Sequence, residues 1–242
     1  MLFVMADSES GYTCYFISRF LEKNIHESVF VIAGVIIIAR LSRVIAIITS
    51  PAVNYIISNI GDSIMCATTQ SPILMGFVLG GIMKVVCTSP LSAMALTAML
   101  DLRGLAMGIA SIACVGGAFS DGTVFRKLKL GNKGDTIGVM LEPLTQADIV
   151  TKNPVPIYFG DFIAGGLSGV IAALLGIVNN APGTSSPIPG MIVPFAFNDY
   201  KTVCFALVGA AISGFIAGNI SSIVTKKILL TRRLLRFSNS KC

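Results

Sequence analysis

Residues 162–198 read FIAGGLSGVIAALLGIVNNAPGTSSPIPGMIVPFAFN and form the longest stretch of the chain without a charged side chain. The first part, 162–178, is apolar and rich in small residues, which predicts a membrane-spanning helix suited to close helix packing. The next part, 179–190, gathers Asn, Pro and Gly and predicts a break. Such a break inside a charge-free stretch is typical of discontinuous transporter helices; a plain extracellular turn is the alternative.

The chain as a whole is far more apolar than a water-soluble protein. Of its 242 residues, 54% are hydrophobic and only 12% are charged, and its mean hydropathy is +0.81. A soluble domain carries about 25% charged residues. A bilayer removes the need for a polar surface, because lipid tails solvate an apolar exterior. The sequence therefore predicts an integral membrane protein with one membrane domain and no second, soluble domain.

The residue patterns of soluble enzymes are missing from the sequence. The one histidine, His26, lies outside the apolar segments, and there is no Ser–His–Asp set, nucleotide-binding loop or metal cluster. The six cysteines are scattered without a CxxC pair, which disfavours disulfides and zinc. The N-terminus lacks a basic region followed by a small-residue cleavage site, so we expect no removable signal peptide. We expect no catalytic residue, no metal and no cofactor.

The net charge of +6 comes from basic residues that flank apolar segments. They form two clusters: Arg126, Lys127, Lys129 and Lys133, and then Lys226, Lys227, Arg232, Arg233, Arg236 and Lys241. Basic residues beside membrane helices mark cytoplasmic segments, so both clusters are predicted to lie in the cytoplasm. No nucleic-acid-binding motif accompanies them, and we expect no nucleic acid as a partner.

Further apolar runs predict further helices. They cover about 28–50, 72–88, 91–100, 104–120 and 202–225, with an interfacial helix over 52–62. The run at 91–100 is too short to cross a hydrocarbon core of about 30 Å alone. The predicted fold is all-α, a polytopic membrane protein with about five to seven spanning or re-entrant helices, including broken half-helices.

The predicted organisation has three regions. Residues 1–27 form an N-terminal polar, interfacial segment, 28–225 the transmembrane domain, and 226–242 a basic cytoplasmic tail. Within the domain, 121–135 is predicted to be a basic cytoplasmic loop. The loop and the tail share one side, so an even number of crossings separates them. We therefore favour a re-entrant or broken half-span at 136–150 over a crossing by 179–198.

The segment 136–150, TIGVMLEPLTQADIV, carries the strongest functional signal. Carboxylates at membrane depth are costly and persist mainly where they line a polar cavity. Pro143 frees backbone carbonyls that again need a protein-lined or wet environment. Glu142, Gln146 and Asp148 are therefore candidate solute-binding residues. The alternative is an ordinary interfacial loop with solvated carboxylates.

Other polar residues beside helix breaks are weaker candidates. Asn179 and Asn180 open the predicted break at 179–190, and Thr88 and Ser89 precede Pro90. These side chains are predicted either to face a cavity or to cap a helix. Lys84 lies inside an apolar run and is expected to pair with Asp101 or Glu142, or to extend to an interface. Asp101 and Arg103 are expected at a helix end.

Three stretches resemble the membrane component, EIIC, of the phosphotransferase-system sugar transporters. They are TSPLSAMALTAMLDLRGLAMGIASIACVGG (88–117), EPLTQADIVTKNPVPI (142–157) and IVNNAPGTSSPIPG (177–190). The likeness is closer to the branch that includes the PfoR-type regulatory membrane proteins, and it covers about 70–195.

The resemblance implies a multi-pass protein of the bacterial plasma (inner) membrane, usually a homodimer, that binds a sugar or related small polar solute. In sugar-transporting members a glutamate and polar groups on re-entrant hairpins hold the sugar, and Glu142-Pro143 is similar to the glutamate-proline of some such sites. The phosphorylatable partner domains are not part of this sequence, so phosphoryl coupling needs separate EIIA/EIIB-type phosphocarrier proteins.

The sequence thus predicts a permease that holds its solute between 136–150 and 179–190 and moves it by alternating access. The alternative is a membrane-bound regulator or sensor of the PfoR type, which keeps the fold without transport.

Overall fold

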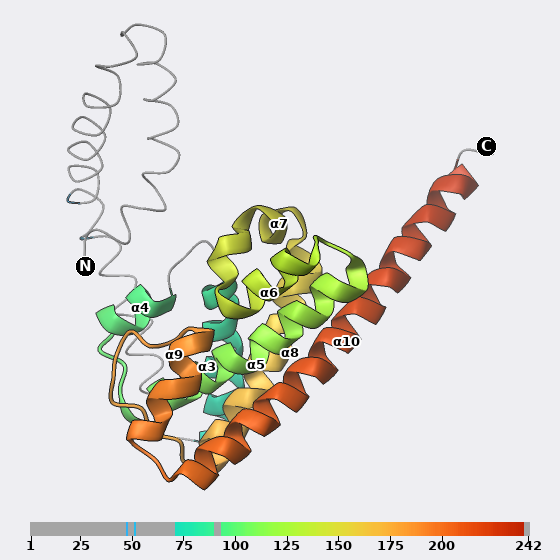
Figure 1. The fold of residues 1–242 in the computed structure, drawn as a ribbon. Coiled ribbons are helices and arrows are strands. Elements are labelled where there is room, and N and C mark those ends of the chain that lie inside the picture. Colours follow the sequence, from blue (N-terminus) through green and yellow to red (C-terminus); the bar gives the residue numbers. More distant parts are fainter. Residues whose placement is uncertain (1–46, 48–50, 52–70, 90–92, 240–242) are drawn as a thin grey trace, which may run out of the picture. The chain divides into compact units, whose positions relative to one another are not determined.

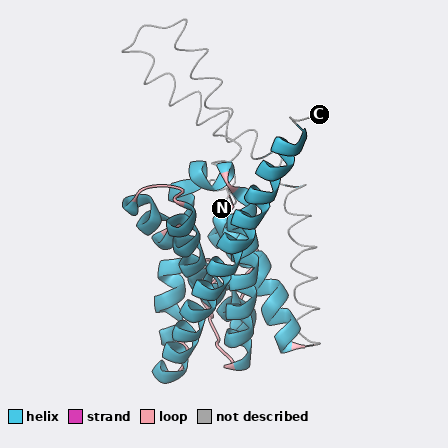
Figure 2. Cartoon of the chain, turned by 90° about the vertical axis from the view of Figure 1, so that its right-hand side faces the viewer, coloured by secondary structure: helices cyan, strands magenta, loops and turns pink. Residues whose placement is uncertain are grey.

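The structure is a computed structural model that describes residues 71–89 and 93–239, the isolated residues 47 and 51, and side chains as far as Lys227. The described part is all-α, as predicted, and contains no strand (Figures 1 and 2). Its helices are α3 (Pro72–Thr88), α4 (Ala93–Met99), α5 (Gly104–Leu128), α6 (Lys133–Leu141), α7 (Ala147–Lys152), α8 (Pro154–Leu174), α9 (Pro187–Ile192) and α10 (Tyr200–Asn239), with 3-10 turns η1 (Pro143–Gln146) and η2 (Val193–Ala196). The predictions for 1–27, 28–50 and 52–62 lie outside this part.

The bundle is built around α8, which packs against α3, α5 and α10. Its contact with α3 is antiparallel and uses glycines. Gly76 lies against Gly169, and Gly80 lies against Gly165, so close that a Cβ added at any of the four would meet a backbone atom at 2.1–2.7 Å. Small residues spaced by four on both helices allow this approach, as the sequence predicted for α8.

α5 is longer than the sequence predicted. We expected a helix over 104–120 followed by a loop over 121–135, but α5 continues to Leu128 and ends where Lys129 adopts a left-handed conformation with φ 55°. Placing the loop at 121–128 was wrong. A count of charge-free residues ends each helix at the first charge, whereas Asp121 is fully buried inside the bundle.

α8 and α10 also differ from their predicted ranges: α8 begins before 162 and ends at Leu174, short of 178, and α10 extends beyond 202–225 at both ends. Asn153 ends α7, and Pro154 occupies the first turn of α8, where its missing N–H costs nothing. α8 therefore begins before Asp161, which the charge-free count had excluded. α10 replaces the predicted 202–225 span and continues as one helix into the basic tail.

The segment 179–198 forms a hairpin that follows α5 and returns; we call it the 179–198 hairpin. It starts where the Asn179 amide donates to the Gly104 carbonyl, at the beginning of α5. It reaches the level of Cys114, whose thiol donates to the Ser185 carbonyl, a depth of about 15 Å by helical rise. The chain comes back through α9, and Asn198 pairs with Val178. The predicted break is confirmed, and its geometry is a re-entrant hairpin.

The outer surface of the bundle is apolar. α5, α8 and residues 200–227 of α10 are each long and apolar enough to cross a membrane, and α3 is a shorter apolar helix. Large hydrophobic side chains stay exposed, among them Leu74 on α3, Leu174 on α8 and Phe205 on α10. An apolar exterior of this kind fits lipid and supports the membrane location.

Candidate functional site

Three charged side chains meet in the middle of the bundle, one from each of α3, α5 and α8. The Lys84 ammonium lies 2.7 Å from Asp121 Oδ2 and 3.6 Å from Asp161 Oδ1. All three side chains are 0% exposed. We call Lys84, Asp121 and Asp161 the charge cluster. Buried ionisable groups in an apolar bundle are costly, which makes the cluster a functional candidate.

Glycine creates the space for the lysine. The Lys84 stem crosses α5 at Gly117, where an added Cβ would come within 1.9 Å of Lys84 Cε. Asp121 stands one turn further along the same face of α5, because residues four apart are neighbours on a helix. On α5, Gly117 therefore leaves space for the Lys84 side chain, and Asp121 binds its ammonium group.

The predicted partners of Lys84 were wrong. Asp101 pairs with Arg103 at 2.9 Å, and both side chains are exposed at the start of α5, the helix-end position that we expected. Sequence reasoning missed Asp121 and Asp161 because each borders a charge-free run and was assigned to its end. The sequence did contain a sign of their position: Lys84, Asp121 and Asp161 each have apolar residues on both sides, which is typical of a charged residue inside a helix.

The cluster leaves buried polar atoms without partners. Among the described residues, Asp121 Oδ1, both carboxyl oxygens of Asp161 and the Ser120 hydroxyl have no hydrogen-bond partner. Buried polar groups are nearly always hydrogen-bonded, and exceptions concentrate at functional sites. The bundle therefore holds hydrogen-bonding capacity that its own side chains do not satisfy.

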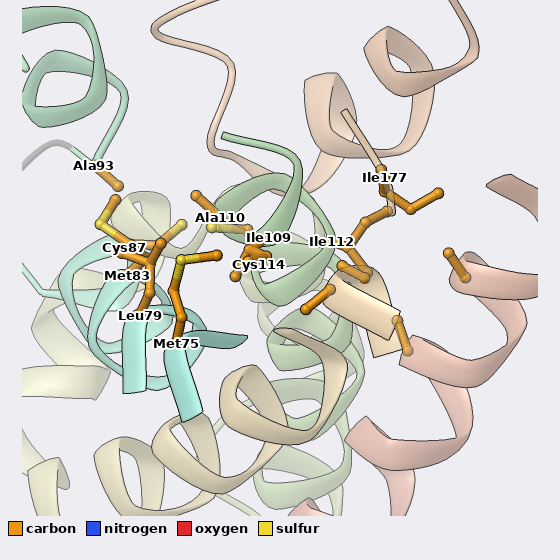
Figure 3. Close-up of a cluster of buried hydrophobic side chains, with 14 of the residues drawn as sticks. Met75, Leu79, Met83, Cys87, Ala93, Ile109, Ala110, Ile112, Cys114 and Ile177 are labelled. Carbon is orange, nitrogen blue, oxygen red and sulfur yellow. The ribbon is translucent and has the colours of Figure 1, made fainter. Parts of the chain in front are cut away.

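The tip of the 179–198 hairpin lies next to this region. Cys87 of α3 and Cys114 of α5 both direct their thiols at the Ser185 carbonyl, at 3.8 Å and 3.5 Å. Figure 3 shows Cys87 and Cys114 on facing helices, within an otherwise apolar cluster. The Ser185 hydroxyl shares a 3.1 Å hydrogen bond with Thr97 of α4. The hairpin tip is thus anchored beside the helix turn that follows Lys84.

Thr88 is the one predicted site residue that borders the charge cluster. Its buried hydroxyl donates to the Lys84 carbonyl at 3.2 Å and lies close to the Asp161 carboxyl group. Ser89 is half-buried and donates to the Val86 carbonyl at 2.8 Å. Both hydroxyls thus donate to backbone carbonyls of the last turns of α3, and Thr88 also lies beside Asp161.

Glu142 lies at the predicted break. It follows the last residue of α6 in an extended conformation, and Pro143 begins η1. η1, which begins directly after Glu142, contacts α3. No described residue forms a hydrogen bond or an ion pair with the half-buried Glu142 carboxylate. Glu142 therefore has a free acceptor beside the end of α3.

The other two candidates on this segment differ in position. Gln146 is half-buried and its amide lies next to Gly138, so it stays beside the break. Asp148 is exposed and lies 3.9 Å from Lys152, one turn along α7. The structure groups Gln146 with Glu142 and leaves Asp148 on the surface.

Asn179 and Asn180 hold the hairpin in place. The Asn179 side chain is fully buried; it donates to Ser111 and Thr184, each at 2.9 Å, and accepts from the Ala181 amide. Asn180 is exposed, and its side chain accepts from the Gly104 amide. The side-chain amide of Asn179 therefore has hydrogen-bond partners within the protein for both its nitrogen and its oxygen. No group of three His, Cys, Asp or Glu side chains in the described part could hold a metal ion.

Comparison with known proteins adds a family match. The model of a family described as "Phosphotransferase system, EIIC" matches residues 10–236, most of the chain. No curated protein and no solved structure matches the chain.

Proposed function

The chain belongs to the phosphotransferase-system EIIC family, and we propose that it is the subunit through which a sugar or related small polar solute crosses the membrane. Transport proceeds by alternating access. The family supports a membrane component of the transporter type, which works with separate EIIA/EIIB-type phosphocarrier proteins. In this proposal the protein is a homodimer of the PfoR-type branch in the bacterial plasma membrane, with its basic tail in the cytoplasm.

The observation that carries the proposal is the position of Glu142. A carboxylate without a partner in the described part lies at a helix break, where η1 meets α3. α6 also contacts α9 of the 179–198 hairpin. A sugar offers several hydroxyl donors, and hydrogen bonds to a charged acceptor are the stronger kind. In this proposal the solute lies between the Glu142 break and the 179–198 hairpin.

The remaining candidates take different roles in this proposal. Gln146 and Thr88 supply neutral polar groups beside Glu142, and Ser89 ends α3 next to them. Asn179 and Asn180 shape the hairpin that closes the site. Asp148 is assigned to the entrance of the proposed solute site, because its carboxylate is exposed.

Counterflow into proteoliposomes tests the proposal with a panel of labelled hexoses and hexitols. Glu142→Gln removes the charge and keeps the size, and we expect uptake to fall about ten- to a hundredfold. The matched control is Asp101→Asn, an exposed carboxylate whose φ of 46° suits asparagine. The control should transport like the native protein.

The regulator hypothesis predicts a different result in the same experiment. A PfoR-type sensor would bind one solute of the panel without flux, and Glu142→Gln would weaken binding alone. Uptake that is equal in the native protein and Glu142→Gln contradicts a solute site at Glu142.

A further inference from the structure

The formal charges of the charge cluster do not sum to zero when both aspartates are ionised. Lys84 contributes one positive charge, and Asp121 and Asp161 contribute two negative charges when ionised. All three side chains are shielded from solvent. A net charge in such a site lacks both water and counter-ions, and its cost far exceeds that of a neutral site. The interior therefore requires one more positive charge, or one fewer negative charge, next to Lys84.

No described residue on a neighbouring helix supplies the missing positive charge. The titratable groups that surround the cluster are Cys87 on α3, Cys114 on α5 and Tyr158 on α8, with Glu142 directly before η1, which contacts α3. α10, which also packs against α8, has no charged residue between Lys201 and Lys226. α7 contacts α8 as well, and its charged side chains, Asp148 and Lys152, are exposed. The groups that surround the cluster are thus neutral or negative. Within the described part of the chain, the compensation is therefore left to a bound cation or proton.

The hydrogen-bond geometry separates the two carboxyl groups. Asp121 accepts a 2.7 Å hydrogen bond from Lys84, which suits an ionised carboxylate. Asp161 is 3.6 Å from the ammonium, and neither of its oxygens has a hydrogen-bond partner in the described part. Asp121 Oδ1 is likewise unsatisfied among the described residues, and both carboxyl groups lie against the same Lys84 ammonium. One O–H on Asp161 that donates to Asp121 would satisfy both groups at once.

We propose that the charge cluster is a proton-binding site, with one proton held on Asp161 and donated in a hydrogen bond to ionised Asp121. Lys84 remains an ammonium, so the site holds one positive and one negative charge and is neutral. Because its three groups belong to α3, α5 and α8, separating α8 from the other two helices exposes Asp161 to water. The proton then exchanges with solvent, and protonation is linked to helix arrangement.

A metal cation fits this site less well. An ion close enough to be coordinated by both carboxylates would share them with the Lys84 ammonium, which already occupies Asp121 Oδ2. Two positive charges at that separation repel strongly in a medium of low dielectric constant. A proton adds no bulk and needs no further oxygen ligands.

Infrared spectroscopy of the full chain in lipid tests this proposal without any solute. Exposed carboxylates are ionised at neutral pH, so a carboxylic acid C=O band at that pH reports a buried, protonated group. We expect the native protein to show this band, Asp161→Asn to lose it, and Asp101→Asn and Glu142→Gln to keep it. Replacing sodium by choline should leave the band unchanged.

Three spectroscopic results would overturn the proposal. The first is a native protein without the band at neutral pH. The second is a band that persists in Asp161→Asn. The third is a band that appears only when sodium is removed, which would identify a cation site.

Two further measurements guard against a variant that does not fold. Labelling aspartate carboxyl groups with carbon-13 in the native chain should shift the band, whereas a band from Glu142 would not move. Asparagine mimics a protonated aspartate, so the melting temperature of Asp161→Asn should equal that of the native protein at neutral pH. A drop of several degrees would show an ionised Asp161 that Lys84 stabilises, and would contradict the proposal.

Discussion

Two polar regions lie inside this apolar bundle, and they differ in how far the protein satisfies them. The 179–198 hairpin is polar, yet the donors and the acceptor of the Asn179 amide all have partners within the protein. The charge cluster is smaller, yet three of its four carboxyl oxygens have no hydrogen-bond partner among the described residues. Buried polar groups whose hydrogen bonds are all satisfied stabilise one conformation, whereas buried groups without partners are able to bind a ligand or a proton. The hairpin is therefore held by its own hydrogen bonds, whereas the charge cluster keeps hydrogen-bonding capacity that no described residue uses.

The largest expected effect is the loss of the lysine from the cluster. Lys84→Met keeps most of the side-chain length but leaves Asp121 buried without its counter-ion, which costs about 3–5 kcal/mol of unfolding free energy. Reversible unfolding in detergent micelles measures it. Lys84→Met combined with Asp121→Asn removes both charges and should regain most of the loss. A single variant as stable as the native protein would show that the cluster is not held by charge.

The packing that surrounds the cluster should be the next most sensitive feature. An added methyl at Gly165 would meet the Gly80 carbonyl at 2.4 Å and Lys84 Cβ at 2.6 Å. We expect Gly165→Ala to cost about 2–3 kcal/mol, because backbone cannot move aside as a side chain can. Gly209→Ala on α10 is the control, since its methyl would meet only the flexible Ile171 side chain at 3.1 Å. Equal stability of the two variants would contradict the close α3–α8 contact.

The hairpin should respond more weakly. Asn179→Ala removes three hydrogen bonds, two to side chains and one to backbone, and is expected to cost about 1–2 kcal/mol. Asn180→Ala, which removes a single exposed hydrogen bond, should cost less than about 1 kcal/mol. Hydrogen exchange of the 179–198 amides locates the change. Faster exchange in Asn180→Ala than in Asn179→Ala would reverse the roles assigned to them.

Several features were predictable from the sequence because they depend on local composition. The apolar runs predicted the helices that became α3, α8 and α10, and the small residues of 162–178 predicted close packing. Pro143 and the cluster of turn-forming residues at 179–190 predicted both breaks. Asp101 and Arg103 lie at a helix end, as expected. Each of these inferences needs only a residue and its close neighbours in the chain.

The errors share one physical cause. A charged residue ends a predicted span because its desolvation is costly, and this cost is correct for an isolated helix. Asp121 and Asp161 remain inside α5 and α8 because Lys84 faces them from a third helix. Ending each predicted helix at a charge therefore gave α8 a late start and α5 an early end. It also left Asp121 and Asp161 out of the predicted partners of Lys84. Compensation between residues 37 and more positions apart is invisible to such a count.

The sequence by itself determined that this chain lies in a membrane as broken and continuous helices, because apolar content and turn residues act locally. It also marked Glu142 and the 179–190 segment as polar groups that interrupt apolar helices. Only the tertiary structure brought Lys84, Asp121 and Asp161 together, because glycines on α3, α5 and α8 let the helices approach closely enough for one ammonium to reach two carboxyl groups. The pairing of buried charges is a property of helix packing, and no single helix contains it.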